Sequence, residues 1–248
     1  MDPLLLGVIA GVLPLALGFL PRILVGNRNG TWRQFSGGLA LGFLALFFVD
    51  LVEDSGGLGE SLGLAFSASQ VMLVASFILG YVALAAAARG IGETDLETSH
   101  LLAYFVAVGI GLHSLAEGIV TGYNFAGELV IDERSVLLQG VSFAIHKFLE
   151  GFTVAVFAPM PFRGRRFAVL MGMAGLPLLL GIPWGIIMYP AILANLLFAA
   201  GAGATLFIVS QVAVGIQKGK FTKWTGLGFT VGFLLVYLAG LIHFTEFH

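Results

Sequence analysis

Two histidine–glutamate pairs stand in the most apolar part of this chain. His113 is followed four residues later by Glu117, and His146 is followed in the same way by Glu150. Residues four apart lie on one face of a helix, one turn from each other. Imidazole nitrogens and carboxylate oxygens together bind zinc and other first-row divalent ions. If the two faces meet, they predict a metal site with two imidazoles and two carboxylates.

The sequence around these pairs is that of a membrane protein. Of its 248 residues, 58% are hydrophobic and 10% are charged, whereas a soluble domain carries about 25% charged residues. Ionisable residues inside a membrane are costly and mark ion or proton pathways by default. A purely structural polar network between helices is the alternative. The chain has no cysteine, which excludes disulfides and thiolate ligands, and its net charge of -2 gives no sign of a nucleic-acid partner.

Eight apolar segments are long enough to cross a bilayer, which takes roughly 20 residues each. They are residues 3–24, 36–53, 67–88, 101–123, 136–158, 167–189, 191–215 and 224–243. Only Tyr189-Pro190 separates the sixth and seventh segments, which predicts a tight helical hairpin. The loops are short, so we expect residues 1–248 to form a single all-α integral membrane domain. The first segment lacks a basic start and a cleavage site, so we interpret it as a span.

The basic residues orient the eight spans. Ten of the twelve lysines and arginines fall in loops on one side of the predicted topology. They are Arg22, Arg28, Arg33, Arg89, Arg163, Arg165, Arg166, Lys218, Lys220 and Lys223. Positive loops face the cytoplasm, which places both termini on the extracytoplasmic side and predicts a multi-pass protein of the cell (plasma or inner) membrane.

Acidic residues at the span ends suggest where a cation enters and leaves. Asp50, Glu53 and Asp54 share one face at the outer end of the second span, at spacings that allow an electronegative funnel. A solvated helix end explains them equally well. On the inner side, His100 ends the acidic stretch "GETDLETSH", which is either a weak release site or charge at a helix start.

The paired motifs resemble those of the ZIP family of divalent-metal transporters. The resemblance lies in "HSLAEG" (113–118) and "HKFLEG" (146–151), in the eight spans, and in "AAGAGATLFIVSQ" (199–211). It implies a 3+2+3 arrangement of the spans and a metal site at His113, Glu117, His146 and Glu150. It also implies that spans one, four, five and six slide against spans two, three, seven and eight, carrying metal into the cytoplasm.

The sequence departs from the family pattern around a second metal. By resemblance, Ser114 replaces an asparagine ligand, and Lys147 stands where the motif has Asn or Asp. Leu176 precedes Pro177 where relatives often have a glutamate, and Gln211 lies near the exit where relatives often have a stronger ligand. We therefore expect a single-metal site in which Lys147 replaces the second metal. The alternative is that Lys147 points to another partner.

The resemblance favours transport of Zn²⁺, with Fe²⁺, Mn²⁺ and Cd²⁺ as further candidates, and not an enzyme. The alternatives are an integral-membrane zinc-dependent hydrolase and a non-transporting metal-sensing relative. A hydrolase would hold its metal near one membrane face with a position open for water. The expected partners are divalent metal ions and the lipid bilayer, with no nucleic acid and no separate cofactor; a homodimer is left open.

Overall fold

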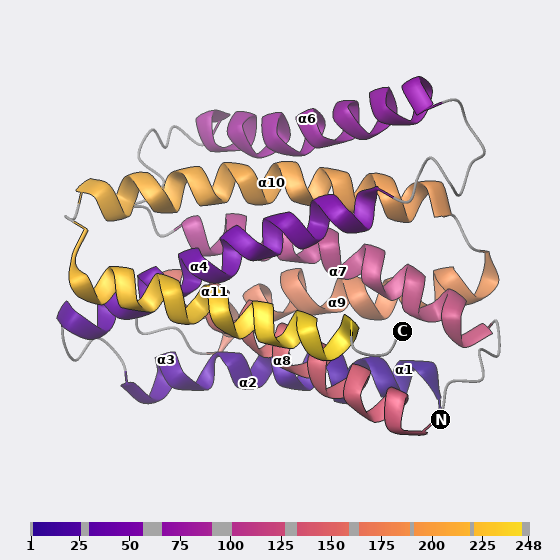
Figure 1. Cartoon of the computed structure of the whole chain (residues 1–248), viewed down its shortest axis with the longest axis horizontal. Helices are drawn as coiled ribbons and strands as arrows, with labels where there is room; N and C mark the ends of the chain where they lie inside the picture. Colours follow the sequence, from indigo (N-terminus) through magenta and orange to yellow (C-terminus); the bar gives the residue numbers. More distant parts are fainter. Residues whose placement is uncertain are drawn as a thin grey trace.

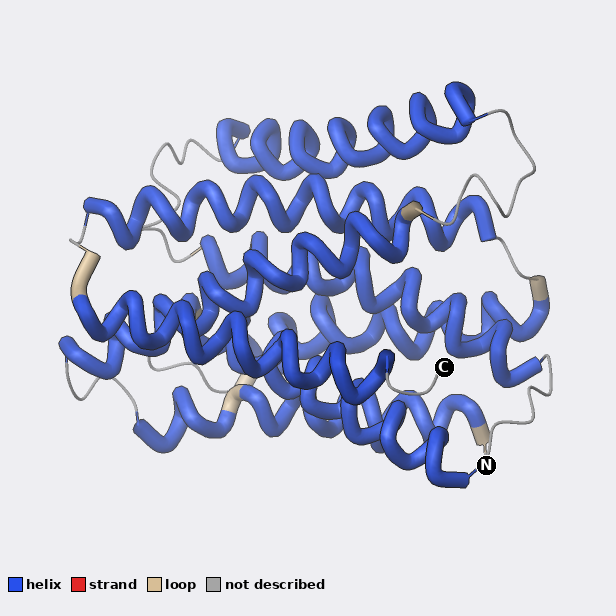
Figure 2. The backbone as a smooth tube through the Cα atoms, viewed as in Figure 1, coloured by secondary structure: helices blue, strands red, loops and turns tan. Residues whose placement is uncertain are grey.

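The computed structural model shows a bundle of long helices that run side by side (Figure 1). It describes residues 2–25, 30–56, 66–90, 101–126, 133–158, 164–188, 191–218 and 221–244. Within these ranges every regular element is helical, as the tube in Figure 2 shows. The predicted hairpin turn at Tyr189-Pro190 lies outside the described residues.

Eight helices in the described part of the chain are long and apolar enough to cross a membrane, which confirms the predicted all-helical architecture with eight candidate spans. The first span, Pro3–Leu24, is assembled from short consecutive pieces. These are α1 (Pro3–Leu6), the π-helix η1 (Gly7–Val12), α2 (Leu13–Gly18) and α3 (Leu20–Val25). The others are α4 (Gly30–Ser55), α6 (Phe66–Gly90), α7 (Leu102–Ala126), α8 (Glu133–Phe157), α9 (Arg165–Ile187), α10 (Ala191–Lys218) and α11 (Lys223–Phe244).

The helices differ in how deeply the bundle buries them. In the most apolar part of α7, 67% of residues are buried, compared with 17% for α6. Figure 1 agrees, because α6 lies at one edge of the bundle with α10 beneath it, and the first span lies at the opposite edge. An apolar helix that stays exposed on most sides suits contact with lipid. One of the two histidine–glutamate pairs is therefore carried by the best shielded helix, α7, and the other by α8, of whose most apolar part 50% is buried.

Among the described glycines, close contacts join the helices in four pairs: the first span with α8, α7 with α9, α4 with α11, and α6 with α10. The first two pairs carry the histidine–glutamate residues. We call the first span, α7, α8 and α9 the site group, and α4, α6, α10 and α11 the second group. At several described glycines an added Cβ would come within 3.0 Å of another helix's backbone, and each such contact stays inside one group. Gly118 meets Leu178 across α7 and α9, and Gly42 meets Phe229 across α4 and α11. Small residues permit such close backbone approach in membranes.

The two groups also contact each other. A Cβ added at Gly201 of α10 would lie 3.7 Å from the backbone nitrogen of His113, an ordinary van der Waals distance. The Ser142 hydroxyl on α8 donates a hydrogen bond of 2.8 Å to the carbonyl of Ala239 on α11. The histidine–glutamate pairs lie where α7 and α8 face α4 and α10.

Candidate metal site

Helices α7 and α8 place the two pairs at similar depth. His113 lies eleven residues after Leu102 and thirteen before Ala126. His146 lies thirteen residues after Glu133 and eleven before Phe157. At a rise of about 1.5 Å per residue, each histidine is roughly 17–20 Å from either end of its helix. Both pairs therefore lie in the middle of their helices.

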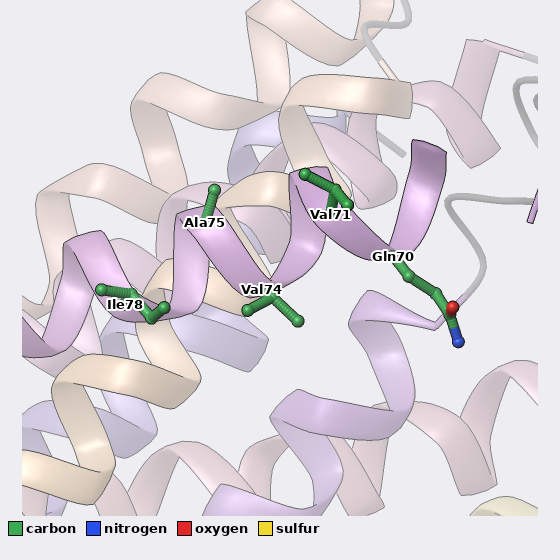
Figure 3. Close-up of a pocket in the computed structure, with 5 residues that line it drawn as sticks. All are labelled: Gln70, Val71, Val74, Ala75 and Ile78. Atoms are coloured by element: carbon green, nitrogen blue, oxygen red, sulfur yellow. The ribbon is translucent and has the colours of Figure 1, made fainter. Parts of the chain in front are cut away.

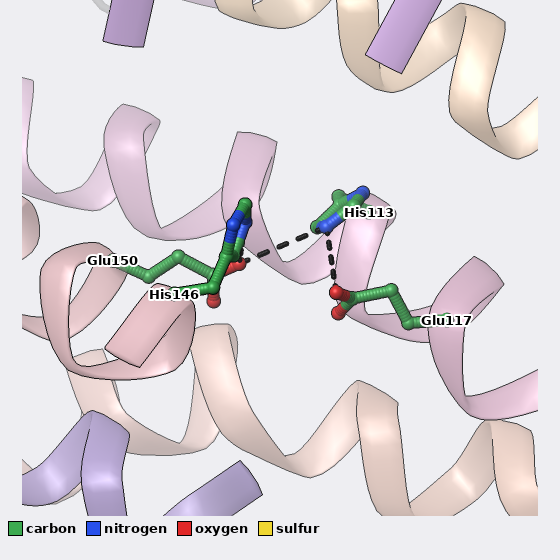
Figure 4. Close-up of side chains that lie close together, drawn as sticks. All are labelled: His113, Glu117, His146 and Glu150. Atoms are coloured by element: carbon green, nitrogen blue, oxygen red, sulfur yellow. Dashed lines mark ion pairs between the residues drawn. The ribbon is translucent and has the colours of Figure 1, made fainter. Parts of the chain in front are cut away.

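The four side chains converge, as Figure 4 shows. One ligand atom from each of His113, Glu117, His146 and Glu150 lies within 4.8 Å of the others. Nε2 of His113 is 2.9 Å from Oε1 of Glu117 and 3.7 Å from Oε1 of Glu150. Nε2 of His146 is 3.3 Å from that same Glu150 oxygen. A possible metal-binding group thus sits buried among apolar helices.

Lys147 points into this group. Its ammonium donates to both carboxylate oxygens of Glu150 at 2.9 Å and to the hydroxyl of Ser114 at 3.0 Å. It also forms an ion pair with Oε2 of Glu117. Lys147 and Glu150 are fully buried. Because a buried charge must be paired, the two glutamates and the lysine hold one another in place.

The histidines keep unused ligand capacity. Within the described structure, neither ring nitrogen of His113 makes a hydrogen bond of good geometry, and Nε2 of His146 makes none either. Yet His113 is only 2% exposed. Buried polar atoms without partners are uncommon in native proteins and call for a specific explanation. A cation among the four side chains would bind the two Nε2 atoms, which lie 2.9 and 3.3 Å from glutamate oxygens without good hydrogen-bond geometry.

The donor set fits a tetrahedral divalent ion. Bonds of about 2.0–2.1 Å place the ligand atoms of a tetrahedral zinc shell about 3.3 Å apart. The ligand atoms of this group lie within 4.8 Å of one another, so each must move inward to form such a shell. The two nitrogens and two oxygens are ligands that suit zinc and its first-row neighbours better than Mg²⁺ or Ca²⁺.

Of the predicted entrance residues, Asp50 and Asp54 lie within electrostatic range of His113 and His146. Asp50 is half-buried on α4, whereas Glu53 and Asp54 are exposed. The acidic face therefore approaches the metal-binding group from one end of the bundle.

Of the predicted exit residues, Gln211 lies in the described part of the chain. It is on α10 and half-buried. His100 lies outside the described residues.

Sequence reasoning missed three aromatic residues that line the site. Phe43 and Phe47 of α4 and Phe198 of α10 each have a ring within 6 Å of a histidine ring. Phe43 and Phe47 are four residues apart, so their shared face was visible in the sequence. Its position against the histidines was not, because that depends on how α4 packs against α7 and α8.

A hollow on the surface of the bundle is lined mainly by apolar side chains. It lies along α6 and is lined by Gln70, Val71, Val74, Ala75 and Ile78 (Figure 3). Four of these five side chains are apolar, and all come from one helix at the edge of the bundle. This surface suits lipid contact and has little to offer an ion.

No protein-family model matches this chain, and no curated protein matches it at a significant level. The functional interpretation therefore rests on the helices and the geometry of the site.

Proposed function

We propose that this protein transports a divalent metal cation across a membrane through the group of His113, Glu117, His146 and Glu150. The observation that carries the proposal is the meeting of these four side chains at the middle of two membrane-length helices. A metal bound there is far from both ends of the bundle, so it is on a path through the protein.

The charges favour one metal ion at a time. Glu117 and Glu150 together carry two negative charges, and Lys147, in direct contact with both, carries one positive charge. The group without metal therefore has a net charge of -1. One bound dication then leaves the group with a net charge of +1, whereas two would leave +3 in a buried site. Such an excess is costly where the effective dielectric constant is low. Lys147 is therefore proposed to take the place of a second metal.

The two helix groups supply a way to move the ion. All four metal-binding residues belong to the site group, whereas Asp50 and the phenylalanine rings belong to the second group. Close glycine contacts join α7 to α9 and the first span to α8 inside the site group, and α4 to α11 and α6 to α10 inside the second group. Sliding of one group against the other would carry the ion between the two membrane faces without dismantling its ligands. This is the rigid-body type of domain motion that repacks one interface.

We further propose that the protein is a ZIP-like importer, with metal moving from the outside to the cytoplasm. The paired motifs, the eight candidate spans and the sidedness of the basic residues support this assignment. Zn²⁺ is the leading substrate, with Fe²⁺, Mn²⁺ and Cd²⁺ as candidates. The depth of the group disfavours a membrane hydrolase, whose metal we expect near one membrane face.

Metal flux into liposomes that contain the purified protein tests the proposal. The parent should admit Zn²⁺, and Glu117→Ala and His146→Ala should each abolish the flux. Thr153→Val is a matched control, because Thr153 is buried on α8 and its hydroxyl bonds only the carbonyl of Leu149 in the same helix. Flux that survives in both site variants, or an inactive parent that still binds zinc stoichiometrically, would contradict transport through this group.

A further inference from the structure

Three phenylalanine rings form a wall on the histidine side of the proposed metal site. Phe43 and Phe47 are fully buried on successive turns of α4, and their rings stack with centroids 5.3 Å apart. Phe198 approaches from α10, with its ring 5.5 Å from that of His113. We call Phe43, Phe47 and Phe198 the aromatic wall. All three belong to the second group, whereas the metal-binding residues belong to the site group.

Phe47 makes the closest contacts of the wall. Its ring centroid is 4.7 Å from that of His113, nearly perpendicular at 87°, and 5.4 Å from that of His146. Phe43 adds a contact of 5.8 Å to His146. Both imidazoles are thus covered by carbon on the side that faces α4. Phenyl rings carry no lone pair for a first-row divalent ion, and they leave no polar partner to hold a water there.

The carboxylate side of the site is also occupied. The Lys147 ammonium lies against the oxygens of Glu150 and Glu117 and also donates a hydrogen bond to the hydroxyl of Ser114. Water could reach a bound ion only beside Glu117 and His146, whose side chains are 15% and 18% exposed in the described structure. An ion held here has four protein ligands and little space for additional water.

We infer that the aromatic wall limits the coordination number of the bound ion and so sets metal specificity, an inference that rests on the proposed metal site. Mg²⁺ and Mn²⁺ favour octahedral oxygen shells, and Mg²⁺ keeps several waters when bound. The wall denies them those waters. Zn²⁺ and Co²⁺ accept four ligands, which the two histidines and two glutamates supply. Phe47 is the main specificity-determining residue because it contacts both imidazoles.

Co²⁺ is the probe that tests the wall, because its visible absorption is intense in a four-coordinate site and weak in a six-coordinate one. The purified parent protein loaded with Co²⁺ should show the intense spectrum. Phe47→Ala opens space beside both imidazoles, so it should lose most of this absorption while still binding Co²⁺. It should also reduce the preference for Zn²⁺ over Mn²⁺, measured as the Mn²⁺ Kd divided by the Zn²⁺ Kd, by about tenfold. This is the lower end of the effects that residues around metal ligands have on metal affinity.

Phe19→Ala is the matched control. Phe19 is fully buried in the first span and packs its ring against Phe167 of α9. It should keep the parent spectrum and the parent metal preference. If Phe47→Ala does not fold, Phe198→Leu removes a ring from the same wall and should weaken the spectrum in the same direction.

The outcomes separate the wall from the metal site itself. A weak spectrum in a parent that binds Co²⁺ stoichiometrically overturns the inference and leaves the proposed function standing. The same holds if Phe47→Ala binds Co²⁺ with an unchanged spectrum and unchanged Zn²⁺ preference. A parent that binds no Co²⁺, or that binds it equally well after His113→Ala, contradicts the proposed metal site.

Discussion

Replacing Lys147 with methionine should have opposite effects on the metal-free and the metal-bound protein. The substitution keeps much of the side-chain length but removes the ammonium that contacts Ser114, Glu150 and Glu117. Loss of one partner from a buried ion pair costs about 3–5 kcal/mol, because the other charge stays behind unpaired. Here two carboxylates lose their common partner. The metal-free variant should therefore be less stable by about 3–5 kcal/mol.

Zinc should recover part of this loss. A dication and an ammonium about 5 Å apart repel by roughly 6–7 kcal/mol at an effective dielectric constant of 20. The lysine can retreat from a bound ion, so we expect a smaller gain, with zinc binding about 10- to 100-fold tighter in the variant. At saturating zinc this adds about 1.4–2.7 kcal/mol of stabilisation beyond that of the parent.

Thermal unfolding of the detergent-solubilised protein, with and without Zn²⁺, measures both effects. Lys223→Met is the matched control, because Lys223 begins α11 and its ammonium lies over the ring of Trp224, outside the site. The control should melt like the parent under both conditions. The reasoning is refuted if Lys147→Met melts at the parent temperature without zinc, or if zinc raises its melting temperature no more than that of the parent.

Three further predictions follow from the same contacts. Lys147→Asp should raise bound Zn²⁺ from one to two per chain or change metal preference; unchanged stoichiometry and preference would contradict its role as a substitute for a metal. Asp50→Asn should raise the Zn²⁺ concentration for half-maximal flux at low salt, because it removes a charge near the histidines; an unchanged value would leave Asp50 without a role in entry. Gly118→Ala should destabilise the protein by about 1–3 kcal/mol, because the added Cβ would meet the carbonyl of Leu178. Gly172→Ala is the control, because its Cβ would meet only the end of a leucine side chain. Equal melting temperatures of the two variants would contradict the close packing of Gly118.

The architecture was largely predictable because a membrane span must satisfy its backbone polar groups within a helix and present apolar side chains to lipid. Long apolar segments therefore reveal the helices directly. The start of α4 was harder to predict. The helix begins at Gly30, before the predicted start at residue 36, because hydropathy does not register a polar first turn. Trp32 and Phe35 pack their rings 6.0 Å apart in that stretch.

The metal-binding residues were predictable for a local reason. His113 and Glu117 are one helical turn apart, and His146 and Glu150 repeat the pattern, so each pair shares a face whatever the tertiary fold. The sequence left the direction of the Lys147 side chain open, because adjacent residues such as His146 and Lys147 point in directions about 100° apart around the helix axis. The packing of α7 against α8 decides it, by bringing Glu117 to the same ammonium as Glu150.

The aromatic wall could not be predicted from the sequence. This chain has 22 phenylalanines, so another Phe–Phe pair at helical spacing carries no functional signal. Phe47 is distinguished from the other phenylalanines only by its contacts with both histidine rings, which depend on how α4 packs against α7 and α8. Local spacing identifies residues that share a helix, whereas contacts between the two helix groups require the structure.

The zinc content of the purified protein tests the central claim most directly. The parent, dialysed against Zn²⁺ and washed, should hold one zinc per chain by elemental analysis. The combined variant His113→Ala with Glu150→Gln removes a ligand from each of α7 and α8, so it should hold none while Thr153→Val keeps one. A parent without bound zinc, or zinc retained in full by the combined variant, would contradict the account.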